Sequence, residues 1–125
     1  MKALLLVGFG GFLGAISRYK LGVWVAQLIG GGPFPYGTFM VNIVGCLVIG
    51  ALAGIAERYN AFGFAATLFL FTGLLGGFTT FSSFGLDAVQ LLRRGEMLIA
   101  ATYVAGSVCL GFIAVWVGFR LLTAH

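Results

Sequence analysis

A run of nine residues, 76–84, holds residue types that are unusual in an apolar chain. It reads Gly-Gly-Phe-Thr-Thr-Phe-Ser-Ser-Phe, with two glycines, four hydroxyl side chains and three phenylalanines. A helix interrupted at membrane depth is tolerated only where it is buried in protein or lines a cavity. Its freed carbonyl groups can coordinate a cation, and its N–H groups can meet an anion. The run therefore predicts an ion site beside a helix break, which we expect at Gly76–Gly77.

The aromatic and hydroxyl side chains of this run are spaced so that they lie on adjacent helix faces. Phe81 and Phe84 are three residues apart, as are Thr80 and Ser83. Phenylalanine in a spanning helix is more often a packing residue than a ligand. An aromatic ring nevertheless has a positive edge. Two ring edges together with hydroxyl donors would make an anion site without any fixed positive charge.

Two further polar pairs share helix faces elsewhere in the chain. Thr38 and Asn42 are four residues apart, and so are Tyr103 and Ser107. The Asn42 amide offers two N–H donors and one carbonyl acceptor. These groups can line an ion path, but Asn42 can also join two helices, and the hydroxyls can bond their own backbone. Both interpretations stay open from the residues alone.

The elements that must position these side chains follow from composition. The chain has 125 residues, of which 61% are hydrophobic and 8% are charged, whereas a soluble domain has about 25% charged residues. Four apolar runs, at about 3–28, 36–56, 62–92 and 97–122, each reach the roughly 20 residues that span a bilayer. We expect an all-α, multi-pass membrane protein in which residues 1–125 form one four-helix domain whose third helix is broken.

Several function classes find no support in the sequence. The glycine-rich start GFGGFLG does not match a dinucleotide-binding fingerprint, because Leu13 stands where the third glycine belongs. Cys46 and Cys109 lie inside predicted spans, without the spacing of a metal or redox site. The net charge of +4 is spread over helix ends and does not indicate nucleic-acid binding. We expect neither an enzyme nor a nucleic-acid partner.

Positive charge is divided almost equally between the two sides of the predicted four-helix arrangement. One side carries three basic residues, and the other carries two to four, depending on whether those near the end of the first span reach the interface. They are Lys2, Arg58 and Arg120 on one side, and Arg93, Arg94, Arg18 and Lys20 on the other. Orientation normally follows such charges, so their balance predicts insertion both ways and an antiparallel, dual-topology homodimer. Arg18 can serve as a snorkelling or capping residue, or can attract anions into a vestibule.

Glycine pairs at four-residue spacing predict close helix contacts. The chain has 21 glycines, and three of the pairs are Gly10 with Gly14, Gly50 with Gly54, and Gly73 with Gly77. Such pairs let helix backbones approach closely in lipid. They can serve contacts within one subunit or between two subunits.

Three motifs, one in each of the first three spans, point to a known family. They read Gly-Gly-x-x-Gly-x-x-x-Arg-Tyr from Gly10 to Tyr19, Gly-Thr-x-x-Val-Asn-x-x-Gly from Gly37 to Gly45, and the run over 76–84. The fourth span matches more loosely, through Tyr103 and Ser107. With these motifs the chain resembles the Fluc/CrcB fluoride channels of bacteria over essentially its whole length. Three residues differ from the usual pattern: Ser83, Gly85 and Asp87 stand where Thr, Ser and Glu are common.

The resemblance implies passive fluoride export across the inner membrane, which relieves fluoride toxicity, through an antiparallel dimer with two pores. It also implies a structural sodium ion at the dimer interface, held by the main-chain carbonyls of Gly76 and Thr79 from both subunits. The fluoride path would be lined by donors and ring edges, namely Asn42, Phe81, Phe84, Thr38, Ser83, Tyr103 and Ser107.

Two alternatives to a channel deserve a test. A small dual-topology exporter of hydrophobic cations would share the size and the weak charge bias, but it needs a carboxylate in the first span, and residues 3–17 have none. A non-conducting structural subunit would explain the glycines, but it leaves Asn42 and the hydroxyl run without a role.

Overall fold

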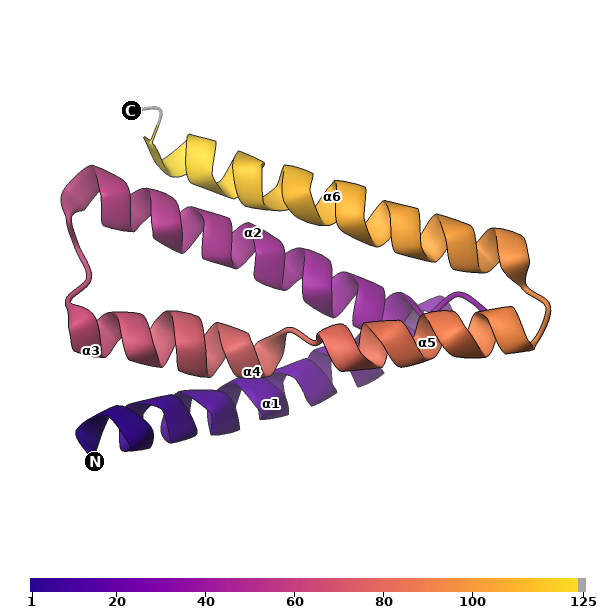
Figure 1. The fold of residues 1–125 in the computed structure, drawn as a ribbon, viewed down its shortest axis with the longest axis horizontal. Helices are drawn as coiled ribbons and strands as arrows, with labels where there is room; N and C mark the ends of the chain where they lie inside the picture. The colour runs from indigo at the N-terminus through magenta and orange to yellow at the C-terminus, as the bar shows by residue number, and fades with distance from the viewer. Residues whose placement is uncertain (124–125) are drawn as a thin grey trace.

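The structure, a computed structural model that describes residues 1–123, contains four long helical segments that run alternately in opposite directions (Figure 1). Three of the segments are continuous: α1 (Lys2–Ile29), α2 (Tyr36–Tyr59) and α6 (Met97–Thr123). The third segment in chain order consists of α3 (Phe64–Thr67), the π-helix η1 (Leu68–Leu75), α4 (Gly76–Phe78) and α5 (Phe81–Arg93). All four segments are long and apolar enough to cross a membrane. The prediction of an all-helical protein with four spans is therefore confirmed.

The break in the third segment lies at Thr79 and Thr80, not at the expected Gly76–Gly77. Gly76 is helical, with φ −62° and ψ −37°, whereas Thr79 and Thr80 have extended backbones, with ψ values of 160° and 121°. Gly77 serves a close approach, since a Cβ there would lie 2.7 Å from the Gly11 carbonyl oxygen. The glycines thus allow helix packing, and the threonines that follow them form the break.

The helices pack in two pairs, and glycine governs both contacts. Figure 1 shows α1 beside the α3–α4 stretch, and α2 beside α6. A Cβ on Gly73 of η1 would lie 2.9 Å from the Val7 carbonyl oxygen, and one on Gly54 of α2 would lie 2.7 Å from the Phe119 carbonyl oxygen. Atoms this close leave no space for a side chain. The glycine pairs that the sequence analysis singled out therefore serve contacts within one chain.

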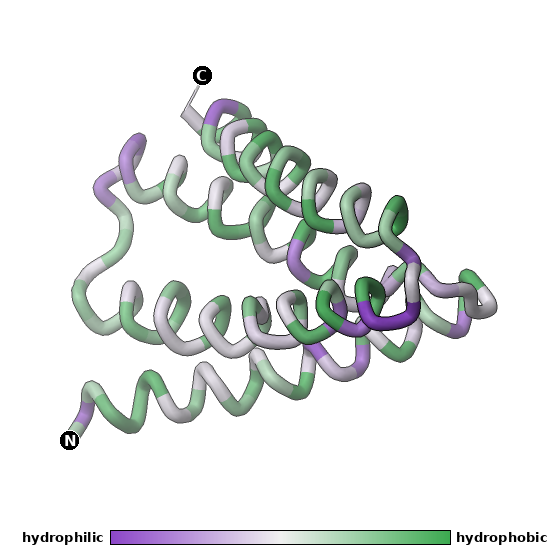
Figure 2. The backbone as a smooth tube through the Cα atoms, turned by 45° about the vertical axis from the view of Figure 1, so that its right-hand side comes forward, coloured by the Kyte–Doolittle hydropathy of each residue, from purple (hydrophilic) through white to green (hydrophobic). Residues whose placement is uncertain are grey.

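The buried core of a single chain is small. Its centre is formed by Leu91 of α5 with Ala100 and Tyr103 of α6, and Phe34, Phe39 and Phe84 pack around it. In an apolar 18-residue stretch of each span, between 11% and 22% of residues are buried. The tube in Figure 2 is mostly green or white along the helices, with purple segments concentrated near the chain reversals and helix ends. Many large apolar side chains are exposed on the surface of the single chain, as they are in a membrane span.

Candidate functional site

The candidate site is built around two hydrogen bonds between Asn42 of α2 and Thr80 in the break. The Asn42 Nδ2 donates a hydrogen bond to the Thr80 carbonyl oxygen at 2.9 Å, and the Thr80 N–H donates to Asn42 Oδ1 at 2.8 Å. One side chain thereby satisfies both backbone groups of a residue that belongs to neither adjoining helix. Asn42 has two N–H donors, and this pairing uses one of them.

A third hydrogen bond caps the start of α5, the helix that follows the break. The Ser83 N–H donates to Thr80 Oγ1 at 3.2 Å, so Thr80 is the N-cap of α5. Threonine suits this position because its hydroxyl accepts from an N–H that has no partner inside the helix. The cap fixes the start of α5 and, with it, the positions of Phe81 and Phe84.

These hydrogen bonds leave two carbonyl groups without the N–H partners that a continuous α-helix would give them. In an α-helix each N–H bonds the carbonyl four residues earlier, so the Thr80 N–H would pair with Gly76 and the Ser83 N–H with Thr79. Here these N–H groups go to the Asn42 and Thr80 side chains instead. The Thr79 N–H still donates to the Leu75 carbonyl oxygen at 3.0 Å. Helical pairing thus ends one residue before Thr80.

Arg18 contacts the break from α1. Its Nε donates to the Gly77 carbonyl oxygen at 3.1 Å, which is one of the last carbonyls of α4. A positive charge is favourable at such a helix end. The same side chain also lines a cavity, so the capping and vestibule interpretations of Arg18 are compatible.

Two cavities meet at the break. The larger, of about 490 Å³, lies between the third segment and the α2–α6 pair, and the smaller, of about 270 Å³, lies beside α1. Thr80 lines both cavities. Of the residues singled out from the sequence, the larger is lined by Asn42, Gly76, Thr79, Phe81, Phe84 and Ser107, and the smaller by Arg18, Thr38 and Ser83.

The two phenylalanine rings after the break differ in exposure. Their centroids lie 5.8 Å apart. Phe84 is partly buried and packs on Tyr103, at 5.1 Å between centroids, whereas Phe81 is 83% exposed. An aromatic ring this exposed needs lipid or another protein surface as its neighbour.

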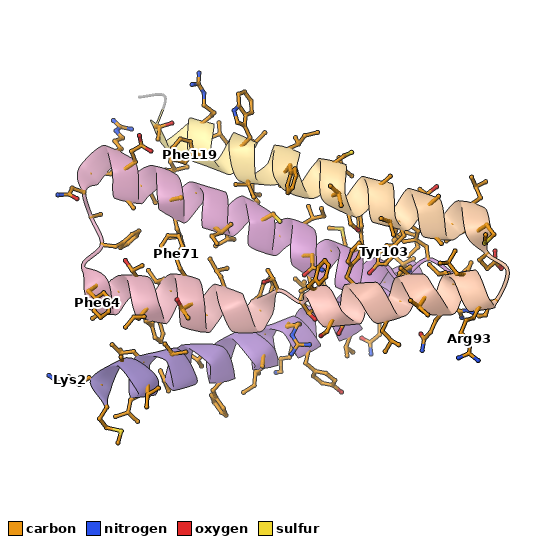
Figure 3. The ribbon with its side chains drawn as sticks, viewed as in Figure 1. Lys2, Phe64, Phe71, Arg93, Tyr103 and Phe119 are labelled. Carbon is orange, nitrogen blue, oxygen red and sulfur yellow. The ribbon has the colours of Figure 1, made fainter. Side chains whose placement is uncertain are left out.

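Tyr103 has a hydrogen-bond partner that the sequence did not predict. The phenol donates a hydrogen bond to Asp87 Oδ2 at 3.2 Å, and Tyr103 is fully buried. Figure 3 shows the labelled Tyr103 on the side of α6 that is turned toward α5. A carboxylate within a span needs such a partner, and this need was the only signal in the sequence. Tyr103 lines neither cavity.

Ser107, one turn along α6 from Tyr103, is the opposite case. Its buried Oγ has no hydrogen-bond partner among residues 1–123, and the residue lines the larger cavity. Buried polar atoms are nearly always paired in proteins. The Ser107 hydroxyl therefore has hydrogen-bonding capacity that no group among residues 1–123 uses.

Comparison with known proteins agrees with this picture. Residues 5–119 match the family model described as CrcB-like protein, Camphor Resistance (CrcB). This chain belongs to the CrcB family. Similar proteins named "Fluoride-specific ion channel FluC" include that of Methylobacillus flagellatus, 45% identical over 98% of this chain and 95% of the relative. That of Rhizobium johnstonii is 46% identical over 99% and 98%, and that of Chloroflexus aurantiacus is 45% identical over 97% and 95%.

The CrcB match confirms the family resemblance that the sequence motifs carried. The matched region contains α2, the break and nearly all of α1 and α6. The hydrogen bonds of Thr80 and both cavities therefore lie within the residues that match the CrcB family model. This CrcB chain is a multi-pass membrane protein.

Proposed function

We propose that this chain is the subunit of a fluoride-selective channel that lets fluoride leave the cell passively across the inner membrane and so relieves fluoride toxicity. The observation that carries the proposal is the similarity, over nearly the full length, to proteins named as fluoride-specific channels. The geometry supports it, because the larger cavity at the break contains neutral hydrogen-bond donors from Asn42 and Ser107. A channel of this kind needs no catalytic group, so the chain is not expected to be an enzyme.

Fluoride gives up its water only to a path that replaces it with other donors. In the larger cavity these are the second N–H of Asn42, the unpaired hydroxyl of Ser107 and the ring edges of Phe81 and Phe84. Ring edges carry partial positive charge, so all four groups suit an anion. None of them carries a formal charge that would hold the ion too tightly to leave.

The remaining predicted path residues have distinct places. Thr38 and Ser83 line the smaller cavity with Arg18, whose charge would draw anions toward the break. The Tyr103 hydroxyl donates to Asp87, so it can donate to fluoride only when that hydrogen bond is exchanged. We therefore propose that Tyr103 lies beside the path, and that its hydroxyl becomes available to fluoride only after it leaves Asp87.

A second copy of the chain in antiparallel orientation would complete the path. The exposed Phe81 ring and the open larger cavity both lie on a face that a single chain leaves uncovered. The balanced basic charge allows insertion in both directions. We propose an antiparallel homodimer in which each subunit contributes to two pores, within the lipid bilayer.

The carbonyls of Gly76 and Thr79 suit a structural sodium ion at the centre of that dimer. Neutral oxygen ligands fit a hard cation, and both carbonyls have lost their helical N–H partners to side chains. The sodium ion would supply positive charge that holds two subunits together at their breaks. It would be structural and would not be transported.

Ion efflux from liposomes tests the proposal. Vesicles that hold the purified protein are followed with fluoride and chloride electrodes in parallel, and rapid fluoride release without chloride release is the expected result. Release of neither ion from a folded dimer in sodium would instead favour an exporter of hydrophobic cations or a non-conducting subunit.

Phe81→Ile and Phe84→Ile test the ring edges. Isoleucine keeps the apolar bulk but has no positive edge, so each variant should stop fluoride release while the dimer still forms in size-exclusion chromatography. Phe12→Ile is the matched control, because Phe12 is 60% exposed on α1 and lines neither cavity. Fluoride flux that is unchanged in both pore variants would refute the ring-edge role.

A further inference from the structure

The break is held by side chains that divert N–H groups from an otherwise continuous helix. Asn42 Oδ1 takes the N–H of Thr80, and Thr80 Oγ1 takes the N–H of Ser83. We propose that Asn42 and Thr80 are positioning residues, which create the cation site by keeping the carbonyls of Gly76 and Thr79 unpaired. This inference deepens the proposed function and rests on it for the presence of the cation.

Asn42 is suited to this task because it offers a donor and an acceptor side by side. It binds both the N–H and the carbonyl of Thr80, at 2.8 Å and 2.9 Å, as a neighbouring strand would. Only one orientation of the amide satisfies both bonds, so the assignment of its oxygen and nitrogen is fixed. These two hydrogen bonds join residues that are 38 positions apart in the sequence, so α2 holds Thr80 in its extended conformation.

Thr80 completes the arrangement with its own side chain. Its backbone, at φ −150° and ψ 121°, places the hydroxyl where it accepts from the Ser83 N–H. Without that hydroxyl, a continuous α-helix would pair the Ser83 N–H with the carbonyl of Thr79, four residues earlier. The Thr80 hydroxyl thus keeps the Thr79 carbonyl unpaired, and Asn42 keeps the Gly76 carbonyl unpaired.

Removal of either side chain should favour a continuous helix and so weaken the cation site. Without the Asn42 amide nothing on α2 holds Thr80 extended, and without the Thr80 hydroxyl the Ser83 N–H loses the acceptor that favours the extended conformation. An N–H left unpaired at membrane depth is costly, and a helical bond to Gly76 or Thr79 removes that cost. A carbonyl that accepts such a bond has a weaker hold on a cation. Because the proposed site takes both carbonyls from each subunit, one substitution weakens two of its ligands.

The experiment compares sodium binding in the full chain, purified as the dimer in detergent. Thr80→Val removes the hydroxyl without changing side-chain shape, and Thr80→Ser keeps the hydroxyl. Asn42→Leu removes the amide at similar size. Val108→Ala is the control, because Val108 lines the same cavity and has no polar side-chain group that could bond the break. The thermal unfolding midpoint of each protein is measured against sodium chloride concentration, with choline chloride at constant total salt.

Ligand binding to the folded state raises the midpoint with ligand concentration. Wild type, Thr80→Ser and Val108→Ala should reach half of their sodium-dependent stabilisation at the same sodium concentration. Thr80→Val and Asn42→Leu should need at least about ten times more sodium. A merely structural role would lower the midpoint equally in both salts and leave the sodium concentration unchanged.

Two results would overturn the inference. One is a Thr80→Val protein with the sodium response of wild type, and this variant decides the matter if Asn42→Leu does not fold. The other is a wild-type protein that sodium does not stabilise. In that case fluoride efflux from liposomes shows whether the channel proposal survives, because flux without sodium binding removes the cation site alone.

Discussion

Gly10 on α1 allows a sharp test of the packing that supports the break. A Cβ added there would lie 2.6 Å from the Phe69 carbonyl oxygen and 2.8 Å from the Leu74 amide nitrogen. Both are backbone atoms of η1, so neither can turn aside as a side chain would. Ordinary contact begins at 3.4 Å, so the two helices would have to separate by about 0.8 Å in a closely packed interface.

Gly10→Ala should therefore destabilise the protein. Overpacking of this kind costs about 1–3 kcal/mol. Gly8→Ala, two residues earlier on the same helix, is the matched control, because a Cβ on Gly8 would have no neighbour within 4 Å. Alanine favours a helix over glycine by up to about 1 kcal/mol, so Gly8→Ala should be at least as stable as wild type.

The assay is thermal unfolding of both variants in the same detergent and salt, followed by fluoride efflux from liposomes. We expect a lower midpoint for Gly10→Ala only, and slower efflux, because η1 leads directly into α4 and the break. Equal midpoints for the two variants would refute the close contact between α1 and η1.

Two further substitutions separate structural from conducting groups on α6. Tyr103→Phe should cost about 1–3 kcal/mol of stability, because it leaves the Asp87 carboxylate without its phenol donor; Tyr59→Phe, at the 59% exposed ring that ends α2, should change the midpoint little, and equal midpoints would argue against the pair. Ser107→Ala should change stability by less than about 0.5 kcal/mol, since the hydroxyl has no partner among the described residues. The same variant should slow fluoride efflux, and unaltered efflux would remove Ser107 from the path.

The membrane class, the four spans and the family could all be predicted from the amino-acid sequence. These properties depend on local composition and on short motifs, and each can be recognised without knowing which helices touch. The hydroxyl run over 76–84 likewise indicated an interrupted helix, because that composition is unusual at membrane depth. The error of three residues in the location of the break shows the limit of this reasoning, since glycine alone does not distinguish a kink from a close helix contact.

The hydrogen-bond partner of each polar group depends on how the helices pack in three dimensions. The pairing of Asn42 with Thr80 joins residues 38 positions apart, and that of Tyr103 with Asp87 joins residues 16 apart. Helical periodicity places a residue on a face, but it does not say which other helix that face meets. The packing of α2 and α6 against the third segment settled those contacts, and with them which carbonyls and hydroxyls at the break are left without a partner.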